Sequence, residues 1–145
     1  MSSNVAVKKI RCDFSNADLY NSVYIPLFQN KAEFVHLFGS AGSGKSRFEA
    51  QKEIVLSYDW KRRDRKTLVC RKVGTTLKDS CYAELKTVIY DWNLEENFEI
   101  LKSPLSLTNK LTGVQFIFIG LDDVEKVKSI SGVDRIWIEE ATELE

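Results

Sequence analysis

The stretch that most constrains this chain runs from Phe34 to Arg47 and reads FVHLFGSAGSGKSR. Four of its first five residues are apolar, which predicts a buried strand at residues 34–38. Gly39 to Ser46 then fits the pattern G-x-x-x-x-G-K-[ST] of a phosphate-binding loop, which a helix is expected to follow. This order predicts an α/β fold of the P-loop NTPase type, with a mostly parallel sheet flanked by helices.

The residues of this loop have predicted roles in binding a nucleotide. Glycine lets the backbone turn with positive φ and approach a ligand closely. The successive N–H groups and the positive end of the next helix are expected to bind phosphate oxygens, which gives a binding set of Gly39, Ser40, Ala41, Gly42, Ser43, Gly44, Lys45 and Ser46. Lys45 is expected to contact the β- and γ-phosphates and to act as a catalytic residue. The Ser46 hydroxyl is expected to be a ligand of Mg²⁺. The expected ligands are ATP and Mg²⁺, and the alternative is an ordinary Gly/Ser turn followed by a solvated lysine.

A second acidic motif lies near the end of the chain. Ile136 to Ile138 is a short apolar strand, and Glu139 and Glu140 follow it directly. A strand that ends in two acids downstream of a phosphate loop is the Walker B pattern, so we assign Glu139 to Mg²⁺ and Glu140 to the attacking water as catalytic base. The alternative is an exposed acidic helix start, because EEATELE is also a good first turn.

The residues before the loop are less informative. We treat 1–33 as an N-terminal segment leading into an ATPase domain at 34–145, with a possible short strand in VAVKKIRCDF. Tyr24 or Phe28 is a candidate to stack on adenine, and Gln29 a candidate to hydrogen-bond its edge. Packing of both rings on the core is the favoured alternative. His36 is expected to be a packed strand residue.

The rest of the chain reads as alternating helices and strands. A helix is expected from Ser46 to about Trp60, and a strand at 67–71. Thr75 or Thr76 can cap the next helix, whose inward residues at helical spacing are Leu77, Cys81, Leu85, Val88, Ile89 and Trp92. Short strands are expected in FEIL and LSLT, followed by a buried strand from 114 to 119. The pair at 122–123 is expected to cap a short helix rather than bind metal.

Composition narrows the function classes. Lys+Arg and Asp+Glu both number 21, so the formal net charge is zero, which argues against a free-standing, non-specific DNA binder. The basic run at 61–66 is expected to be a solvated helix end, with contact to nucleic acid as the alternative. The cysteines Cys12, Cys70 and Cys81 lack metal-type spacing, and the sequence shows no signal peptide and no long apolar run. We therefore expect a reducing cytoplasm, no membrane and no redox role, with Cys70 a buried thiol.

Three blocks in this order resemble the ATPase region of phage terminase large subunits of the prophage type: GSAGSGKSR, VCRKVGTTLKDSCYAEL and GLDDVEKVKSISGVDRIWIEEATEL. The resemblance runs from about Tyr24 to the C-terminus. It implies an ATPase of the additional-strand, catalytic-glutamate type that drives DNA translocation into a viral capsid, in the host cell cytoplasm. It implies a homo-oligomeric ring, and double-stranded DNA, the portal protein and the terminase small subunit as partners.

The sequence also departs from the family pattern. Ala41 stands where many members carry an arginine that touches the γ-phosphate, so another cation is expected to act there, with Lys72, Lys128, Arg71 and Arg135 as candidates. Glu139 stands where aspartate is commoner. The match stops after the acidic strand, so the chain resembles the N-terminal part of a motor, and nuclease activity is not assigned to it. The alternatives are a nucleotide-binding or portal-docking module without turnover, and a P-loop kinase.

Overall fold

A continuous apolar run makes the strand Lys66–Arg71 (β1) the centre of the sheet. In the computed structural model, which describes residues 12–144, its four middle residues are all buried. β1 pairs in parallel with Gln115–Gly120 (β4) on one side and with Val133–Ile138 (β5) on the other. Strands that are buried on both faces are typical of parallel sheets, so the expected α/β core is confirmed.

The opposite edge of the sheet is antiparallel. Phe98–Lys102 (β2) pairs with Leu105–Asn109 (β3), and β3 pairs with β4, which gives the order β2-β3-β4-β1-β5. The short strands expected around FEIL and LSLT are confirmed, as is the return of the hairpin into the main sheet. The parallel part of the sheet therefore consists of β4, β1 and β5.

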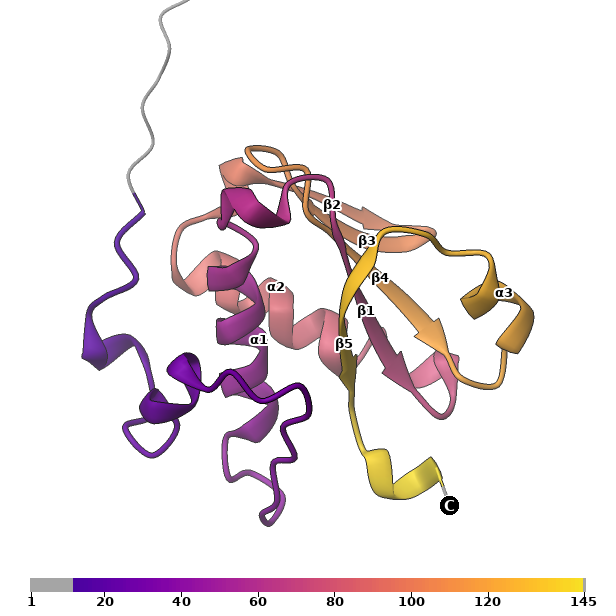
Figure 1. Cartoon of the computed structure of the whole chain (residues 1–145), viewed down its shortest axis with the longest axis horizontal. Coiled ribbons are helices and arrows are strands. Elements are labelled where there is room, and N and C mark those ends of the chain that lie inside the picture. The colour runs from indigo at the N-terminus through magenta and orange to yellow at the C-terminus, as the bar shows by residue number, and fades with distance from the viewer. Residues whose placement is uncertain (1–11, 145) are drawn as a thin grey trace, which may run out of the picture.

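Helices lie on both faces of this sheet (Figure 1). Lys45–Leu56 (α1) and Cys81–Asp91 (α2) pack together on one face, and Val124–Lys128 (α3) lies toward the other. Between residues 12 and 144 the chain also forms short 3-10 helices at Ala17–Leu19, Ile25–Gln29, Trp60–Arg62, Gly74–Thr76, Glu95–Asn97 and Ala141–Leu144. No helix in this described range has the length and apolar character needed to cross a membrane.

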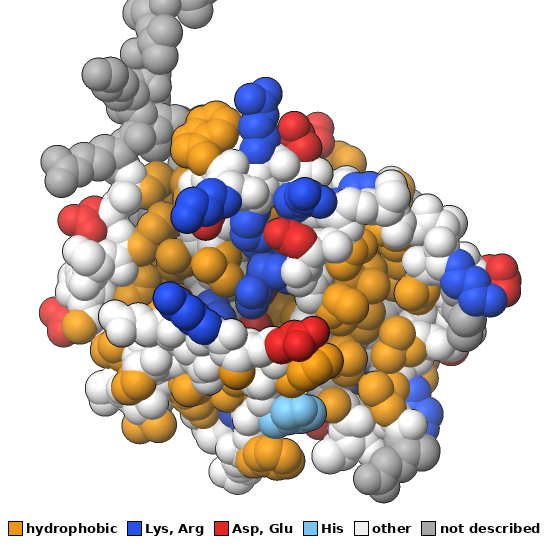
Figure 2. Space-filling model, viewed as in Figure 1, with side chains coloured by type: hydrophobic (Ala, Val, Ile, Leu, Met, Phe, Trp, Pro, Cys, Tyr) orange, Lys and Arg blue, Asp and Glu red, His pale blue; other side chains and the backbone are white. Residues whose placement is uncertain are grey.

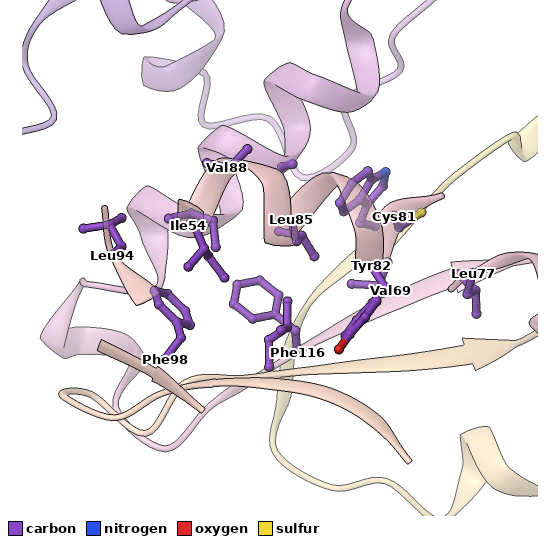
Figure 3. Close-up of a cluster of buried hydrophobic side chains, with 14 residues drawn as sticks. Ile54, Val69, Leu77, Cys81, Tyr82, Leu85, Val88, Leu94, Phe98 and Phe116 are labelled. Atoms are coloured by element: carbon purple, nitrogen blue, oxygen red, sulfur yellow. The ribbon is translucent and has the colours of Figure 1, made fainter. Parts of the chain in front are cut away.

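The main core fills the space between the two long helices and the sheet (Figure 3). Ile54 of α1 and Leu85 of α2 are fully buried there, facing Phe116 of β4 and Val69 of β1. A smaller apolar cluster on the other face contains Leu68, Cys70 and Ile119, with Val127 and Ile130 packed on it. The alternation of β1 residues between the two clusters follows from the two-residue period of a strand.

The N-terminal segment covers the outer side of α1. The Gln51 side chain donates to the Leu19 carbonyl at 2.8 Å, and Tyr24 stacks on Phe48 with ring centroids 5.0 Å apart. This cover accounts for the burial of the polar side chain of Gln51. Most of the strand considered for residues 5–14 lies outside the described residues.

The strand predicted at residues 34–38 is wrong. This segment has no strand assignment, and the side chains of Phe34 and Phe38 are 76% and 86% exposed. His36 is likewise exposed rather than packed in a strand. An apolar run becomes a strand only where it has a hydrogen-bonding neighbour and a covered face. Within residues 12–144 the edge strand β5 pairs with β1 alone, so segment 34–38 forms no ladder with the sheet.

The start of the second long helix was also predicted too early. Thr75 and Thr76 lie in a 3-10 turn, where Thr76 Oγ1 donates to the Val73 carbonyl at 2.8 Å instead of capping a helix. Ser80 precedes α2 as its N-cap residue. The inward-facing set was right, because the residues from Leu77 to Ile89 in it are all buried. At α3 the Asp123 side chain accepts from the Lys126 N–H, which confirms the predicted cap.

Candidate functional site

The glycine loop connects the exposed segment to the first turn of α1. Gly42 and Gly44 have φ of 75° and 87°, in the left-handed region where a side chain is strained. Gly44 is the N-cap of α1, and its carbonyl accepts from the Phe48 N–H at 2.9 Å. The loop therefore ends at a helix N-terminus, where unpaired N–H groups attract anions.

Lys45 folds its side chain back over the loop. Its Nζ donates to the carbonyls of Gly39 at 2.8 Å and Ser40 at 3.0 Å, and to Ser43 Oγ at 3.0 Å. The ammonium group thus lies against the turn that the sequence predicts will hold phosphate. Phosphate binding by this loop stays a prediction.

Ser46 and Glu139, which are 93 residues apart in sequence, are brought together by the fold. Ser46 lies in the first turn of α1, and Glu139 follows the last residue of β5. The Ser46 hydroxyl donates to Glu139 Oε1. The Glu139 N–H donates to the Cys70 carbonyl at 2.9 Å, which continues the β1–β5 ladder and fixes the backbone there. A hydroxyl and a carboxylate that converge in this way fit the oxygen-ligand preference of Mg²⁺.

A hollow of about 250 Å³ lies beside this pair, between the start of α1 and the α2 helix. Besides Ser46 and Glu139, it is lined by Asp79, Ser80, Ala83, Glu84 and Thr87. Its carboxylates and hydroxyls suit a hydrated cation better than a phosphate, since like charges repel. Ser46 and Glu139 therefore fit a magnesium ion that keeps most of its waters, since no three His, Cys, Asp or Glu side chains of the described residues converge to hold a metal.

Glu140 leaves the sheet at the end of β5. It is exposed and has φ of 52°, a left-handed conformation that is uncommon for a residue other than glycine. Its carbonyl accepts from the Glu143 N–H at 2.9 Å, which closes the turn into the last 3-10 helix. The two neighbouring acids therefore have different environments, and the catalytic role of Glu140 stays a prediction.

Tyr24 contacts the loop directly. Its hydroxyl donates to the Ser43 carbonyl at 3.0 Å, and its ring packs parallel to Phe48. Phe28 also packs on Phe48, edge to face. The favoured alternative, packing on the core, thus describes both rings, while Gln29 is exposed at the end of its 3-10 helix. A role for Tyr24 and Gln29 in binding adenine stays a prediction.

The four cations considered for the γ-phosphate lie in different places. Arg71, at the carboxyl end of β1, pairs with Glu143 at 3.2 Å, and this hydrogen bond raises its pKa. Lys72 follows it and is exposed, whereas Lys128 pairs with Glu125 on α3. Arg135 lies near the start of β5, at the end opposite Glu139. Of the four, only the first two lie at the sheet edge that carries the site.

A second polar group, at that opposite end of β5, was missed by sequence reasoning. Arg135 donates through Nε to Oε1 of Glu53, whose side chain is 1% exposed. Thr67 Oγ1 donates to the other Glu53 oxygen at 3.0 Å, and Arg62 donates to both Thr67 and Asp134 at 2.8 Å. Arg62 is therefore buried, which corrects the prediction that the whole basic run at 61–66 is solvated.

Burial shifts the pKa of several groups near the site. It raises the pKa of Glu49 on α1, and the nearby charge of Glu53 acts in the same direction. It also raises the pKa of the Cys81 thiol to about 12, to which the charge of Glu139 contributes. Cys70 is buried as predicted, with its pKa raised to about 11 by burial. These buried thiols are not nucleophiles at neutral pH.

Three further contacts around the site, made by Trp137 and Arg47, were not anticipated. Trp137 Nε1 donates to Glu139 Oε2 at 3.0 Å, and Arg47 joins α1 to α2 through Glu84 at 3.4 Å and Asp91 at 2.5 Å. The two-residue period of a strand places Trp137 and Glu139 on the same face of β5, so the sequence held a signal for the first contact. No sequence pattern indicated the contacts of Arg47.

Comparison with known proteins gives a consistent result. The sequence model described as phage terminase large subunit matches residues 31–145. The chain is 35% identical over 118 residues to the PBSX phage terminase large subunit of Bacillus subtilis strain 168, covering 81% of this chain and 26% of that protein. It is 40% identical over 80 residues to the terminase large subunit of Bacillus phage SPP1, covering 52% of this chain and 19% of that protein. The chain thus spans about a quarter or less of the length of these relatives, and it belongs to the phage terminase large subunit family.

Proposed function

We propose that this chain is a P-loop ATPase region of a phage DNA-packaging motor, which hydrolyses ATP to drive DNA into a capsid. The observation that carries the proposal is the contact between Ser46 and Glu139, which are 93 residues apart in sequence. A phosphate-loop hydroxyl beside the acid that ends a strand is the arrangement that a magnesium–nucleotide site requires. Membership of the terminase large subunit family supports the link to packaging.

Each residue of the site has a proposed role in binding the nucleotide. The backbone N–H groups of residues 39–46 bind the phosphates, and Lys45 leaves its present carbonyl partners to contact the β- and γ-phosphates. Ser46 and Glu139 would hold Mg²⁺, which would supply positive charge to the phosphate oxygens. Tyr24 and Gln29 are proposed to contact the adenine.

Hydrolysis itself is assigned to Glu140. A water oxygen attacks the γ-phosphorus, the bond between that phosphorus and the β–γ bridging oxygen breaks, and the water gives a proton to the Glu140 carboxylate. The products are ADP and inorganic phosphate. Exposure of Glu140 at the end of β5 leaves its carboxylate open to a water and to substrate.

The partners of the proposed motor follow from the family. We propose double-stranded DNA as the translocated substrate, and the portal protein and the terminase small subunit as binding partners in the host cell cytoplasm. A homo-oligomeric ring would bring a cation of one subunit to the nucleotide of its neighbour. Arg71 and Lys72 are the residues proposed for contact with the γ-phosphate, because they lie at the carboxyl end of β1.

Calorimetric titration of the chain with Mg-ATP tests the proposal. We expect saturable binding that is weakened at least tenfold in Lys45→Ala and unchanged in Lys61→Ala, which removes an exposed lysine outside the loop. Absence of binding by the unsubstituted chain, or equal binding by the chain and Lys45→Ala, would contradict the site assignment.

A further inference from the structure

Trp137 is placed to control the carboxylate that is proposed to hold the metal. Its side chain projects from β5 on the same face as Glu139, two residues further on. Its indole Nε1–H donates to Glu139 Oε2 at 3.0 Å, while Oε1 accepts from Ser46. The two carboxylate oxygens therefore have different partners, one an indole and the other the hydroxyl that begins α1.

The indole is itself held rigidly. Trp137 is only 6% exposed and belongs to the main core cluster, in which Cys81 and Leu85 of α2 are also buried. A ring packed in this way cannot turn without disturbing the core. The N–H donor therefore points in one fixed direction.

Glu139 needs such a partner more than an aspartate would. A glutamate has one more rotatable bond than an aspartate, so its carboxylate reaches further and samples more positions. The backbone at Glu139 is fixed by its bond to the Cys70 carbonyl, but this bond leaves the side chain free. The indole contact holds Oε2, so it restricts the side chain together with the Ser46 contact and keeps Oε1 directed at Ser46.

We infer that Trp137 is a positioning residue, whose indole N–H orients the Glu139 carboxylate for Mg²⁺. It touches neither nucleotide nor metal, and it acts through Glu139 alone. Outer partners of this kind commonly change metal affinity by 10- to 100-fold when they are removed. The inference rests on the proposed function, because it assumes that Glu139 holds Mg²⁺ at a bound nucleotide.

The test is the Mg²⁺ dependence of ATP binding, measured by calorimetry at a series of Mg²⁺ concentrations. In Trp137→Phe we expect a rise of about tenfold in the Mg²⁺ concentration that gives half of the maximal effect on ATP affinity. ATP binding in the presence of EDTA should be unchanged. Trp60→Phe is the matched control, because Trp60 is 64% exposed and should leave both quantities unchanged. A second variant replaces Trp137 by β-(3-benzothienyl)alanine, which keeps the bicyclic shape and lacks the N–H, so a loss of core packing cannot imitate the result.

A second measurement reads the hydrogen bond without nucleotide. In a chain with ¹⁵N-labelled tryptophan, Glu139→Gln should shift the indole resonance that Trp137→Phe removes, and it should leave the Trp60 resonance in place. This inference alone would be overturned if the Trp137 resonance did not shift. It would also be overturned if both Trp137 variants bound Mg-ATP with an unchanged Mg²⁺ dependence. A wild-type chain that binds no Mg-ATP would overturn the proposed function and this inference with it.

Discussion

Arg135 donates through Nε to Glu53 Oε1 at 2.6 Å, which joins β5 to α1 at the end of the strand opposite Glu139. Glu53 is almost fully buried, so its charge depends on this partner for compensation. Arg62 approaches the same carboxylate only to 3.9 Å. The contact between Arg135 and Glu53 is therefore expected to matter for stability.

Arg135→Met should destabilise the chain by about 3 kcal/mol, because it leaves a buried carboxylate without its arginine. Urea unfolding followed by circular dichroism measures the change. Arg63→Met is the control, since Arg63 and its partner Asp64 are mostly exposed and should contribute less than about 0.5 kcal/mol. The double variant Glu53→Met with Arg135→Met should recover part of the loss, and equal stability of Arg135→Met and the parent chain would contradict the prediction.

The stability of the chain should depend on pH through Glu49. Burial raises the folded-state pKa of Glu49 above its usual value of 4.5, so the folded state binds the proton more tightly than the unfolded state does. Between these two pKa values the unfolded chain holds fewer protons, and stability falls as pH rises. Glu49→Gln removes this cost, so it should be more stable than the parent at pH 7 and lose the advantage below about pH 4.5. Urea unfolding at both pH values checks this, and Glu95→Gln, at an exposed position, should show no such crossover.

The three thiols should differ in reactivity. With a pKa of about 11, Cys70 is only about one part in a thousand thiolate at pH 8, and Cys81, with a pKa of about 12, is less ionised still. Both are also buried, whereas Cys12 is only half-buried. A disulfide reagent such as DTNB should therefore modify one thiol in the native chain at pH 8 and the other two only in urea. Cys12→Ser should abolish the first phase; if that phase persists, the assignment is wrong.

Tyr24 should support the loop in two separable ways. Tyr24→Phe removes the hydrogen bond to Ser43 and keeps the ring on Phe48, so Mg-ATP affinity should fall about fivefold, which corresponds to about 1 kcal/mol. Tyr24→Leu removes the aromatic face as well and should weaken binding further if adenine stacks on it. Tyr90→Phe, at a residue 52% exposed on α2, is the control. Equal affinity of the Phe and Leu variants would contradict the proposed stacking.

Glu140→Gln should separate binding from hydrolysis. The amide cannot take the proton of the attacking water, so kcat should fall by about 10²- to 10⁴-fold while Mg-ATP affinity stays the same. Phosphate release is the measurement, made on the longest form of the protein that hydrolyses ATP. Glu99→Gln, on an exposed position of β2, is the matched control. A Glu140→Gln protein that turns over at the parent rate would exclude the base role.

Local sequence patterns predicted most of the elements. The apolar run of β1 and the helical spacing of the inward residues of α2 each depend on neighbours close in sequence, and both predictions are confirmed. The convergence of Ser46 and Glu139 was expected because a recognised motif links the two positions. The role of each acid cannot be read from the fold, and it stays a prediction.

The errors have a common physical origin in long-range contacts. The segment 34–38, which contains Phe34 and Phe38, has the apolar composition of a buried strand. Its burial depends on a neighbouring strand and a covering element, which the segment itself does not specify. In sequence Arg62 resembles its solvated neighbours, and its burial follows from contacts with Thr67 and with Asp134, which is 72 residues away. Short-range patterns carry no information about such pairings.

The edge of the sheet formed by β5 is expected to favour self-association of the chain. β5 pairs with β1 on one side, and its residues Ile136 and Ile138 are 63% and 42% exposed. Figure 2 shows apolar side chains gathered on the surface of this side of the molecule. A free strand edge with apolar side chains favours self-association. Ile136→Lys should therefore weaken self-association, so that the chain stays monomeric up to a higher concentration in analytical ultracentrifugation. The same substitution at Leu101, on the other edge strand β2, tests whether the effect is specific to β5.

α1 contacts β5 near both ends of the strand, through Ser46 with Glu139 at one end and through Glu53, and more distantly Glu49, with Arg135 at the other. Ser46 and Glu53 are seven positions apart, which is about 10 Å along the helix, and Arg135 and Glu139 are four positions apart, which is about 13 Å along the strand. The two lengths agree within the reach of the side chains, so both contacts form only in one alignment of helix and strand. One residue inserted between Arg135 and Glu139 would shift the strand by about 3 Å and turn the following side chains to the opposite face. The spacing of these four residues thus sets the register of β5 against α1. The pairing of Arg135 with Glu53, which stabilises one end of the strand, thereby also fixes where Glu139 lies at the other end.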